Sequence, residues 1–313
     1  MQDAGLTALV GAPLGAVAST VTSAVTSAVT GAVTSAVTSA ASPGGDATRW
    51  RPTRFTRAAG LVWRSADARS VTMHLPWVGG LSDSSGAIDA RAIMAMLDHA
   101  ASAAVYRVVA PAIPIATLDL RVAFAGAAPP GCALDFTART SPAEGGVARV
   151  EAVARVAPDG VEVASAAASF FVGASPGGDA ERGDGGGVVP GMERQGAAHF
   201  ASFDAFLGIQ HQPAGACLPF MPRLIGAEAL PALHGGAVAA LLATAACDLA
   251  AAQPTRLAAI NVQYLRAGRA EESTAAATWT KRGARANFVS AIATQAHGTR
   301  EVARAQCVFI TQG

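Results

Sequence analysis

Residues 233–242 read Leu-His-Gly-Gly-Ala-Val-Ala-Ala-Leu-Leu, and the other segments of the chain can be interpreted from this stretch. From Ala237 to Ala243 no polar residue interrupts the apolar run, which indicates a helix that is buried on every side. Pro231 precedes the run, as is common where a chain enters a helix. The two glycines leave the first backbone N–H groups uncovered, which favours the binding of a carbonyl oxygen that gains negative charge.

Two further features follow this helix in the chain. They are an apolar strand over Ala259–Leu265 and a basic turn over Lys281–Arg285. A His-Gly-Gly start, an Ala/Leu-rich helix and these two features in this order resemble the PaaI-like acyl-CoA thioesterases of the hotdog fold. The resemblance implies a helix wrapped by a curved antiparallel sheet, and hydrolysis of an acyl thioester to free acid and CoA. CoA then enters as part of the substrate, and no separate cofactor is expected.

Composition excludes several other classes of protein. The net charge of the 313 residues is +1 and only 14% are charged, so no strong field favours nucleic acid or an anionic membrane. The four cysteines are widely spaced and form no CxxC pair, which favours reduced thiols in a cytoplasmic protein over a disulfide framework or a metal site. No apolar run reaches the roughly 18 residues of a membrane span.

The chain divides into four predicted segments. Residues 1–48 are a low-complexity Ala/Val/Thr/Ser tail in which valine recurs every fourth position between 21 and 37. That period drifts around a helix, so we expect a disordered or weakly helical tail, with a surface or partner-binding helix as the alternative. The other segments are a first hotdog domain (49–174), a Gly-rich linker (175–196) and a second hotdog domain (197–313).

The two predicted domains repeat the same unit. Glu162–Ala166 near the end of the first matches Glu301–Ala305 near the end of the second, and Thr117–Phe124 lines up with Leu257–Tyr264. The fold class expected is therefore α+β, a double hotdog in which two helix-wrapped antiparallel sheets form a pseudo-dimer. Whether two pseudo-dimers then associate as a homodimer is left open.

In PaaI-like enzymes the helix start of one subunit faces a carboxylate nine positions after the corresponding His of its partner, and a hydroxyl on the next strand assists. The second half of this chain carries His234, Gly235 and Gly236, but Ala243 stands at the carboxylate position and Leu257 at the hydroxyl position. By this resemblance the second half has donors for an oxyanion and lacks a base.

The first half shows the complementary loss. Asp98 and Thr117 stand at the carboxylate and hydroxyl positions, whereas Asp89 and Arg91 replace the His and the second glycine. The resemblance therefore implies one composite site, in which Asp98 acts as base or nucleophile, aided by Thr117. In that site Gly235 and Gly236 supply amides and His234 positions the substrate, while the two-fold mate of the site is inactive. A carboxylate satisfied inside a core is the structural alternative for Asp98.

Further residues are candidates for substrate binding. PaaI-like proteins place an Asn six residues before the His, and Glu228 stands there in this chain. The basic side chains of Arg266, Lys281 and Arg282 are candidate partners for the phosphates of CoA, with solvated surface charge as the alternative. His99, beside Asp98, is interpreted as a residue of the helix surface or of an interface.

Two other functions compete with the thioesterase hypothesis. A non-catalytic protein that binds acyl-CoA or acts as a scaffold is favoured by Glu228 and by the incomplete second site. A hotdog hydratase or dehydratase needs a His and a carboxylate paired for proton abstraction, and no such spacing occurs in the sequence. Neither the acyl group nor the oligomeric state follows from the sequence.

Overall fold

The structure is a computed structural model, and it describes residues 52–110, 113–173, 196–213, 215–227 and 232–311. The tail expected over residues 1–48, nearly all of the expected linker over 175–196, and Glu228 lie outside the described residues. The described residues thus form two segments, one on each side of the expected linker.

The first segment contains one long helix and a six-stranded run of sheet. Its elements are α2 (Arg54–Ala59), β1 (Val62–Ala66), β2 (Ser70–Leu75), η2 (Gly79–Leu81), α3 (Ala90–Val108), β3 (Ile115–Phe124), β4 (Leu134–Thr140), β5 (Val147–Val156) and β6 (Glu162–Val172). Helix α3 begins after Asp89 because the Asp89 side chain caps the helix by accepting the N–H of Arg91.

The second segment repeats that order of elements. Its elements are η4 (Ala197–His199), α4 (Phe203–Leu207), β7 (Gln210–Gln212), β8 (Gly215–Leu218), η5 (Pro222–Leu224), β9 (Ile225–Ala227), β10 (Ala232–Leu233), α5 (Gly235–Ala250), β11 (Thr255–Tyr264), β12 (Ser273–Lys281), β13 (Ala286–Gln295) and β14 (Arg300–Thr311). Helix α5 begins after His234, whose side chain accepts the N–H of Gly236. His234 and Asp89 therefore occupy equivalent positions at the starts of the two long helices.

The strands of both segments join into one antiparallel sheet, while β9 and β10 form a separate pair. The order in the twelve-stranded sheet is β1-β2-β4-β5-β6-β3-β11-β14-β13-β12-β8-β7. The two halves of this order mirror each other across the β3–β11 junction, where Ala259 pairs with Ala123 and Gln263 with Asp119. This register is that of a two-fold axis between two equal units. The chain is thus a double hotdog, as predicted.

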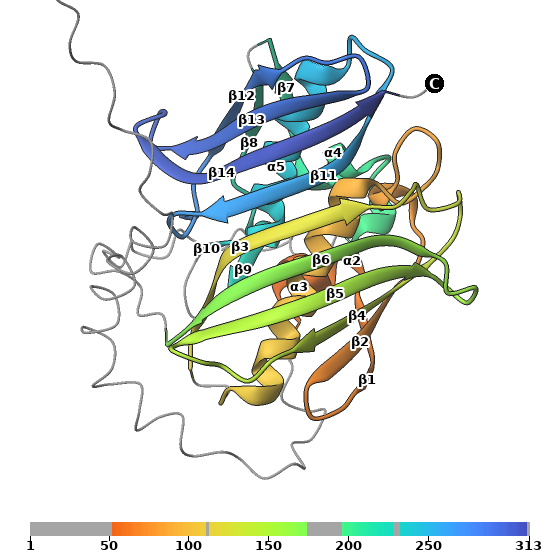
Figure 1. The fold of residues 1–313 in the computed structure, drawn as a ribbon, viewed down its shortest axis with the longest axis vertical. Coiled ribbons are helices and arrows are strands. Elements are labelled where there is room, and N and C mark those ends of the chain that lie inside the picture. The colour runs from red at the N-terminus through yellow and green to blue at the C-terminus, as the bar shows by residue number, and fades with distance from the viewer. Residues whose placement is uncertain (1–51, 111–112, 174–195, 214, 228–231, 312–313) are drawn as a thin grey trace, which may run out of the picture.

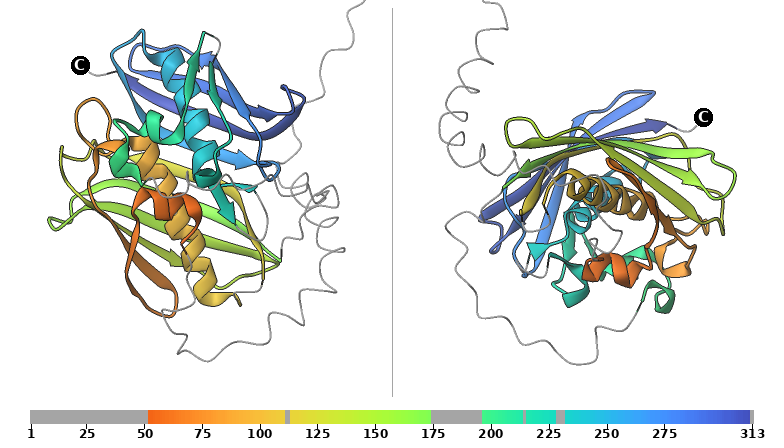
Figure 2. Two further views of the ribbon diagram at one scale, coloured as in Figure 1. Left: turned by 180° about the vertical axis from the view of Figure 1, so that it is seen from behind. Right: turned by 90° about the horizontal axis from the view of Figure 1, so that it is seen from below.

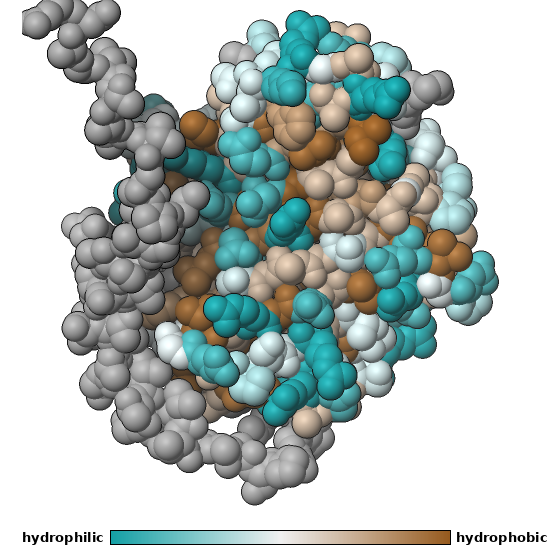
Figure 3. Space-filling model, in the orientation of Figure 1, coloured by the Kyte–Doolittle hydropathy of each residue, from teal (hydrophilic) through white to brown (hydrophobic). Residues whose placement is uncertain are grey.

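Both long helices lie on the same face of the sheet, and the sheet curves around them (Figure 2). Strand alternation explains the layers, since Val150 and Ala152 of β5 are buried against α3 while Glu151 between them is exposed. The opposite face of the sheet looks toward the viewer in Figure 1. On that face, weakly apolar surface runs between groups of hydrophilic side chains (Figure 3).

The two long helices meet closely at the start of α5. A Cβ added to Gly236 would lie 2.6 Å from Cα of Ala95, so only glycine allows this approach of α5 to α3. The contact places the first turn of α5 beside the middle of α3, which is where the sequence places a carboxylate. Among the described helices, none is long and apolar enough to cross a membrane.

Candidate active site

Asp98 is a buried carboxylate in the middle of α3. Asp98 is 4% exposed, and the hydroxyl of Thr117 on β3 donates to Oδ1 of Asp98 across 3.2 Å. Burial raises the pKa of Asp98 to about 6, because desolvation outweighs the hydrogen bonds from Thr117 and from the backbone of Gly236. The group is therefore ionised at neutral pH and is more basic than an exposed aspartate.

The start of α5 presents backbone donors. As the first residue of the helix, Gly235 has no intrahelical acceptor for its N–H, and the helix dipole adds positive potential there. The Gly236 N–H donates to Nδ1 of His234 across 3.0 Å. On the other side of the turn, the Tyr264 hydroxyl at the end of β11 donates to the carbonyl oxygen of Gly235 at 3.1 Å. Both contacts fix the orientation of this first turn.

These two groups face each other. A Cβ on Gly235 would lie 2.9 Å from Oδ2 of Asp98, and the same oxygen is 3.8 Å from Nδ1 of His234. The structure thus brings the carboxylate and hydroxyl of the first half together with the helix start of the second half. The residues that converge are Asp98, Thr117, His234, Gly235 and Gly236.

The place related to this site by the pseudo-two-fold axis holds different side chains. Arg91, in the place of Gly236, bonds to its own cap Asp89 and, through Nη1, to Oδ1 of Asp204 at 2.6 Å and Oγ1 of Thr244 at 2.7 Å. Burial alone would lower the pKa of Arg91, but its bonds to Asp89 and Asp204 raise it, so the guanidinium stays charged. The equivalent of Asp98 is the buried Ala243, so the mate has no carboxylate at that position.

The basic candidates do not all lie near this centre. Arg266 follows Tyr264 closely and is exposed, and its Nη1 donates to the carbonyl oxygen of Glu301. Lys281 and Arg282 are exposed at the β12–β13 turn. Ala286 at the end of this turn and Arg256 of β11 both pair with Ile310 of β14, so the turn lies at the same end of the sheet as Arg256. That is eight residues along β11 from Tyr264, or about 27 Å of strand. The structure therefore does not bring Lys281 and Arg282 together with Asp98.

Three further residues lie at this centre, and the sequence did not predict them as site residues. His99 is 3% exposed and lies in the contact between α3 and α5, not on the surface, with its Nδ1 3.5 Å from Nε2 of His234. Phe55 of α2 stacks on the His234 ring with centroids 4.7 Å apart. Tyr264 is not among the site residues that the sequence predicts. An aromatic residue at the end of a strand that lies next to a helix start was the available signal for it.

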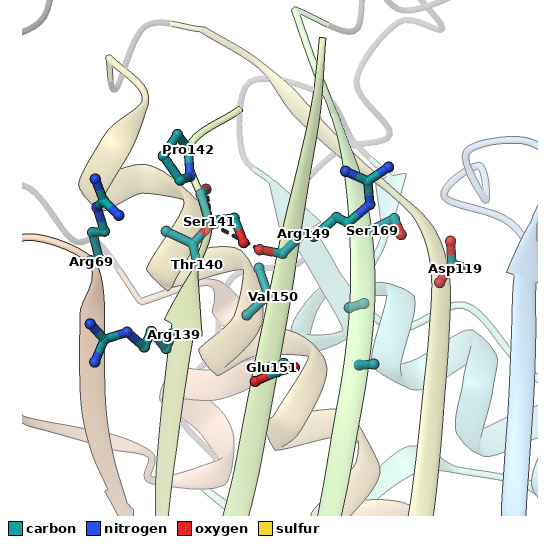
Figure 4. Close-up of a pocket in the computed structure, with 12 residues that line it drawn as sticks. Arg69, Asp119, Arg139, Thr140, Ser141, Pro142, Arg149, Val150, Glu151 and Ser169 are labelled. Carbon is teal, nitrogen blue, oxygen red and sulfur yellow. Dashed lines mark hydrogen bonds between the residues drawn. The ribbon is translucent and has the colours of Figure 1, made fainter. Parts of the chain in front are cut away.

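One further hollow lies on the other face of the sheet. It has a volume of about 470 Å³ and is lined in part by Arg69, Arg139, Arg149, Glu151 and Asp119. Figure 4 shows these side chains along neighbouring strands, with a helix behind the sheet. The hollow opens to solvent away from Asp98, so it is not part of the centre described above. Within the described ranges, no cluster of three or more His, Cys, Asp or Glu could hold a metal ion.

Comparison with known proteins places this geometry in context. Residues 227–310, within the second half, match the family described as the acyl-CoA thioesterase N-terminal domain. No curated protein matches the chain.

Solved structures share the fold at low sequence identity. A candidate thioesterase from Novosphingobium aromaticivorans is 14% identical, with 80% of this chain and 99% of that chain covered and a TM-score of 0.56. The 12:0-ACP thioesterase from Umbellularia californica is 11% identical, with 78% and 94% covered and a TM-score of 0.52. The tesB protein of Mycobacterium avium subs paratuberculosis is 11% identical, with 80% and 96% covered and a TM-score of 0.50. The class is therefore a double-hotdog protein whose second half matches a thioesterase domain family.

Proposed function

We propose that the protein is an acyl-CoA thioesterase with one composite site per chain, of the PaaI-like kind. The observation that carries the proposal is the meeting of the Asp98 carboxylate with the first turn of α5. Asp98 and Thr117 come from one half, and Gly235 comes from the other. We propose CoA as the thiol carrier of the substrate, because the description of the matched family names acyl-CoA thioesterases.

In the proposed reaction the thioester carbonyl lies between the carboxylate and the helix start. Asp98 takes a proton from water as the water oxygen attacks the carbonyl carbon, or the carboxylate attacks that carbon itself. The Gly235 N–H donates to the oxygen that gains negative charge, and collapse of the intermediate releases the thiolate of CoA. Where the carboxylate attacks, this step leaves a mixed anhydride on Asp98, and water then hydrolyses it to the free acid and the original carboxylate. Asp98 and His234 are both buried, so the thioester reaches them only when neighbouring side chains move.

The test is thiol release from acyl-CoA of several chain lengths. We expect Asp98→Asn to lower kcat at least about 100-fold, since it removes the base while keeping the shape. The matched control is Asp119→Asn, because Asp119 lies two residues beyond Thr117 on the same strand and lines the hollow on the other face. Wild-type turnover in Asp98→Asn would refute the mechanism. Binding of a non-hydrolysable acyl-CoA without hydrolysis by the wild type would favour a binding protein.

A hydratase is the second candidate, because the structure brings an imidazole and a carboxylate within 3.8 Å although the sequence shows no such spacing. Against it, Nδ1 of His234 already accepts the N–H of Gly236, and burial lowers the pKa of His234 to about 4. An imidazole held in this way is a weak base for removing a proton from a substrate. An assay for the addition of water to an enoyl-CoA, monitored through the loss of the absorbance of the enoyl-CoA, distinguishes a hydratase from a thioesterase.

A further inference from the structure

His99 and His234 form a buried pair where the two halves of the molecule meet. The two residues are 3% and 5% exposed, and Nε2 of His234 lies 3.5 Å from Nδ1 of His99. Their ring centroids are 5.6 Å apart, and Phe55 stacks on His234 with its centroid 4.7 Å away. The His234 ring is therefore held by contacts from α2, α3 and the backbone of α5.

Contacts at both ring nitrogens of His234, one from the Gly236 backbone and one from His99, determine which nitrogen carries the proton. The Gly236 amide can only donate, and it donates to Nδ1 across 3.0 Å, so Nδ1 must present a lone pair. Burial lowers the pKa of His234 to about 4, and the neutral ring then carries its hydrogen on Nε2. Nδ1 of His99 lies 3.5 Å from Nε2 and accepts that hydrogen when the neutral His99 ring carries its own hydrogen on Nε2.

This tautomer has a consequence for Asp98. Nδ1 of His234 and Oδ2 of Asp98 are two acceptors 3.8 Å apart, and the backbone N–H of Gly236 interacts with both residues, so the imidazole itself donates nothing to the carboxylate. In the other tautomer Nδ1–H would donate to Oδ2 and stabilise the charged carboxylate, which would lower the pKa of Asp98. The other groups around the carboxylate are Thr117 of β3, the Gly236 backbone of α5 and Tyr264 of β11.

We propose that His99 is a positioning residue, which holds His234 in the Nε2–H tautomer and so prevents the imidazole from donating to Asp98. The part of this inference that concerns turnover rests on the proposed thioesterase function. The part that concerns the tautomer rests on the hydrogen bonds alone, so the two can fail separately.

The tautomer is read from nitrogen–proton NMR correlations of ¹⁵N-histidine-labelled full-length protein. We expect His234 of the wild type to be neutral with its proton on Nε2. His99→Leu removes the acceptor and is expected to populate the Nδ1–H tautomer. His99→Asn, whose side-chain oxygen lies near the position of Nδ1, is expected to keep the wild-type tautomer. A wild-type His234 with its proton on Nδ1, or an unchanged tautomer in His99→Leu, overturns the inference.

Kinetics test the consequence for the carboxylate. We expect His99→Leu to lower kcat/KM for acyl-CoA roughly tenfold and to shift the acid limb of its pH profile to lower pH. We expect His99→Asn to keep both the rate and the acid limb close to those of the wild type. A loss of rate without movement of the acid limb would show that His99 only fills space, and would overturn the inference. If the expected tautomers are seen but no variant hydrolyses a thioester, the proposed function fails and the assignment of His99 to the tautomer stands.

Discussion

Asp98, the proposed base or nucleophile, carries a cost in stability. Its pKa in the folded chain is about 6, against an ordinary value of 3.8, because burial disfavours the charged form. The folded state therefore binds more protons than the unfolded state between about pH 4 and pH 6. The stability that protonated Asp98 contributes is fully present below pH 4 and is lost as the pH rises through 6.

This sign leads to a prediction for Asp98→Asn. At pH 7 the variant lacks the buried charge, so we expect its free energy of unfolding to exceed that of the wild type by up to about 3 kcal/mol, the equivalent of a shift of about two pKa units. At pH 4 the difference is expected to shrink toward zero, because Asp98 of the folded wild type is then protonated. Urea unfolding at both pH values measures it. A less stable variant at pH 7 would mean that the carboxylate is structurally satisfied, as the alternative interpretation holds.

At the scale of elements, the two glycines at the start of α5 have different neighbours. A Cβ on Gly236 would lie 2.6 Å from Cα of Ala95, which is backbone and cannot move aside, whereas a Cβ on Gly235 would lie 2.9 Å from the carboxylate of Asp98. The first glycine thus faces the proposed chemistry, and the second faces the packing of the helices.

Substituting each glycine by alanine is expected to separate these roles. Gly236→Ala should lower the free energy of unfolding by about 1–3 kcal/mol, since α5 must move away from α3. Gly235→Ala should lower kcat at least about tenfold, because its Cβ displaces the carboxylate and narrows the space for a substrate oxygen. Chemical unfolding and thiol release, both measured on each variant, provide the check. Equal losses of stability in the two variants would contradict the division.

Much of this element structure was predictable from local patterns. The strand expected over Ala259–Leu265 lies within β11 except for its last residue, because strand alternation is a local signal. The start of α5 was predictable from its glycines and apolar run. Helix α2 was not anticipated, since six residues carry too little periodicity. The convergence of Asp98 with Gly235 came from the resemblance to a family, because nothing local connects residues 137 positions apart.

At the scale of the molecule, the two pseudo-equivalent sites differ in content. One holds a carboxylate beside the start of a helix. In the other, Arg91 of the first half bonds to Asp204 and Thr244 of the second half, so a bridge between the halves fills the place that is equivalent to the proposed catalytic centre. No sequence pattern indicated this bridge, because Arg91 lies more than 100 residues from both partners and each residue is ordinary alone.

The bridge should matter for stability and not for turnover. In Arg91→Met the apolar stem remains, but the carboxylates of Asp89 and Asp204 lose a buried partner, and we expect the free energy of unfolding to fall by about 3–5 kcal/mol. Arg155→Met, at an exposed pair with Glu162, is the control and should cost at most about 1 kcal/mol.

Because Arg91 is not in the proposed site, the folded Arg91→Met variant should hydrolyse acyl-CoA at close to the wild-type rate. This is the reverse of Asp98→Asn, which should gain stability and lose turnover. A folded Arg91→Met protein without activity would show that the two sites are coupled, and that the second is more than a structural bridge.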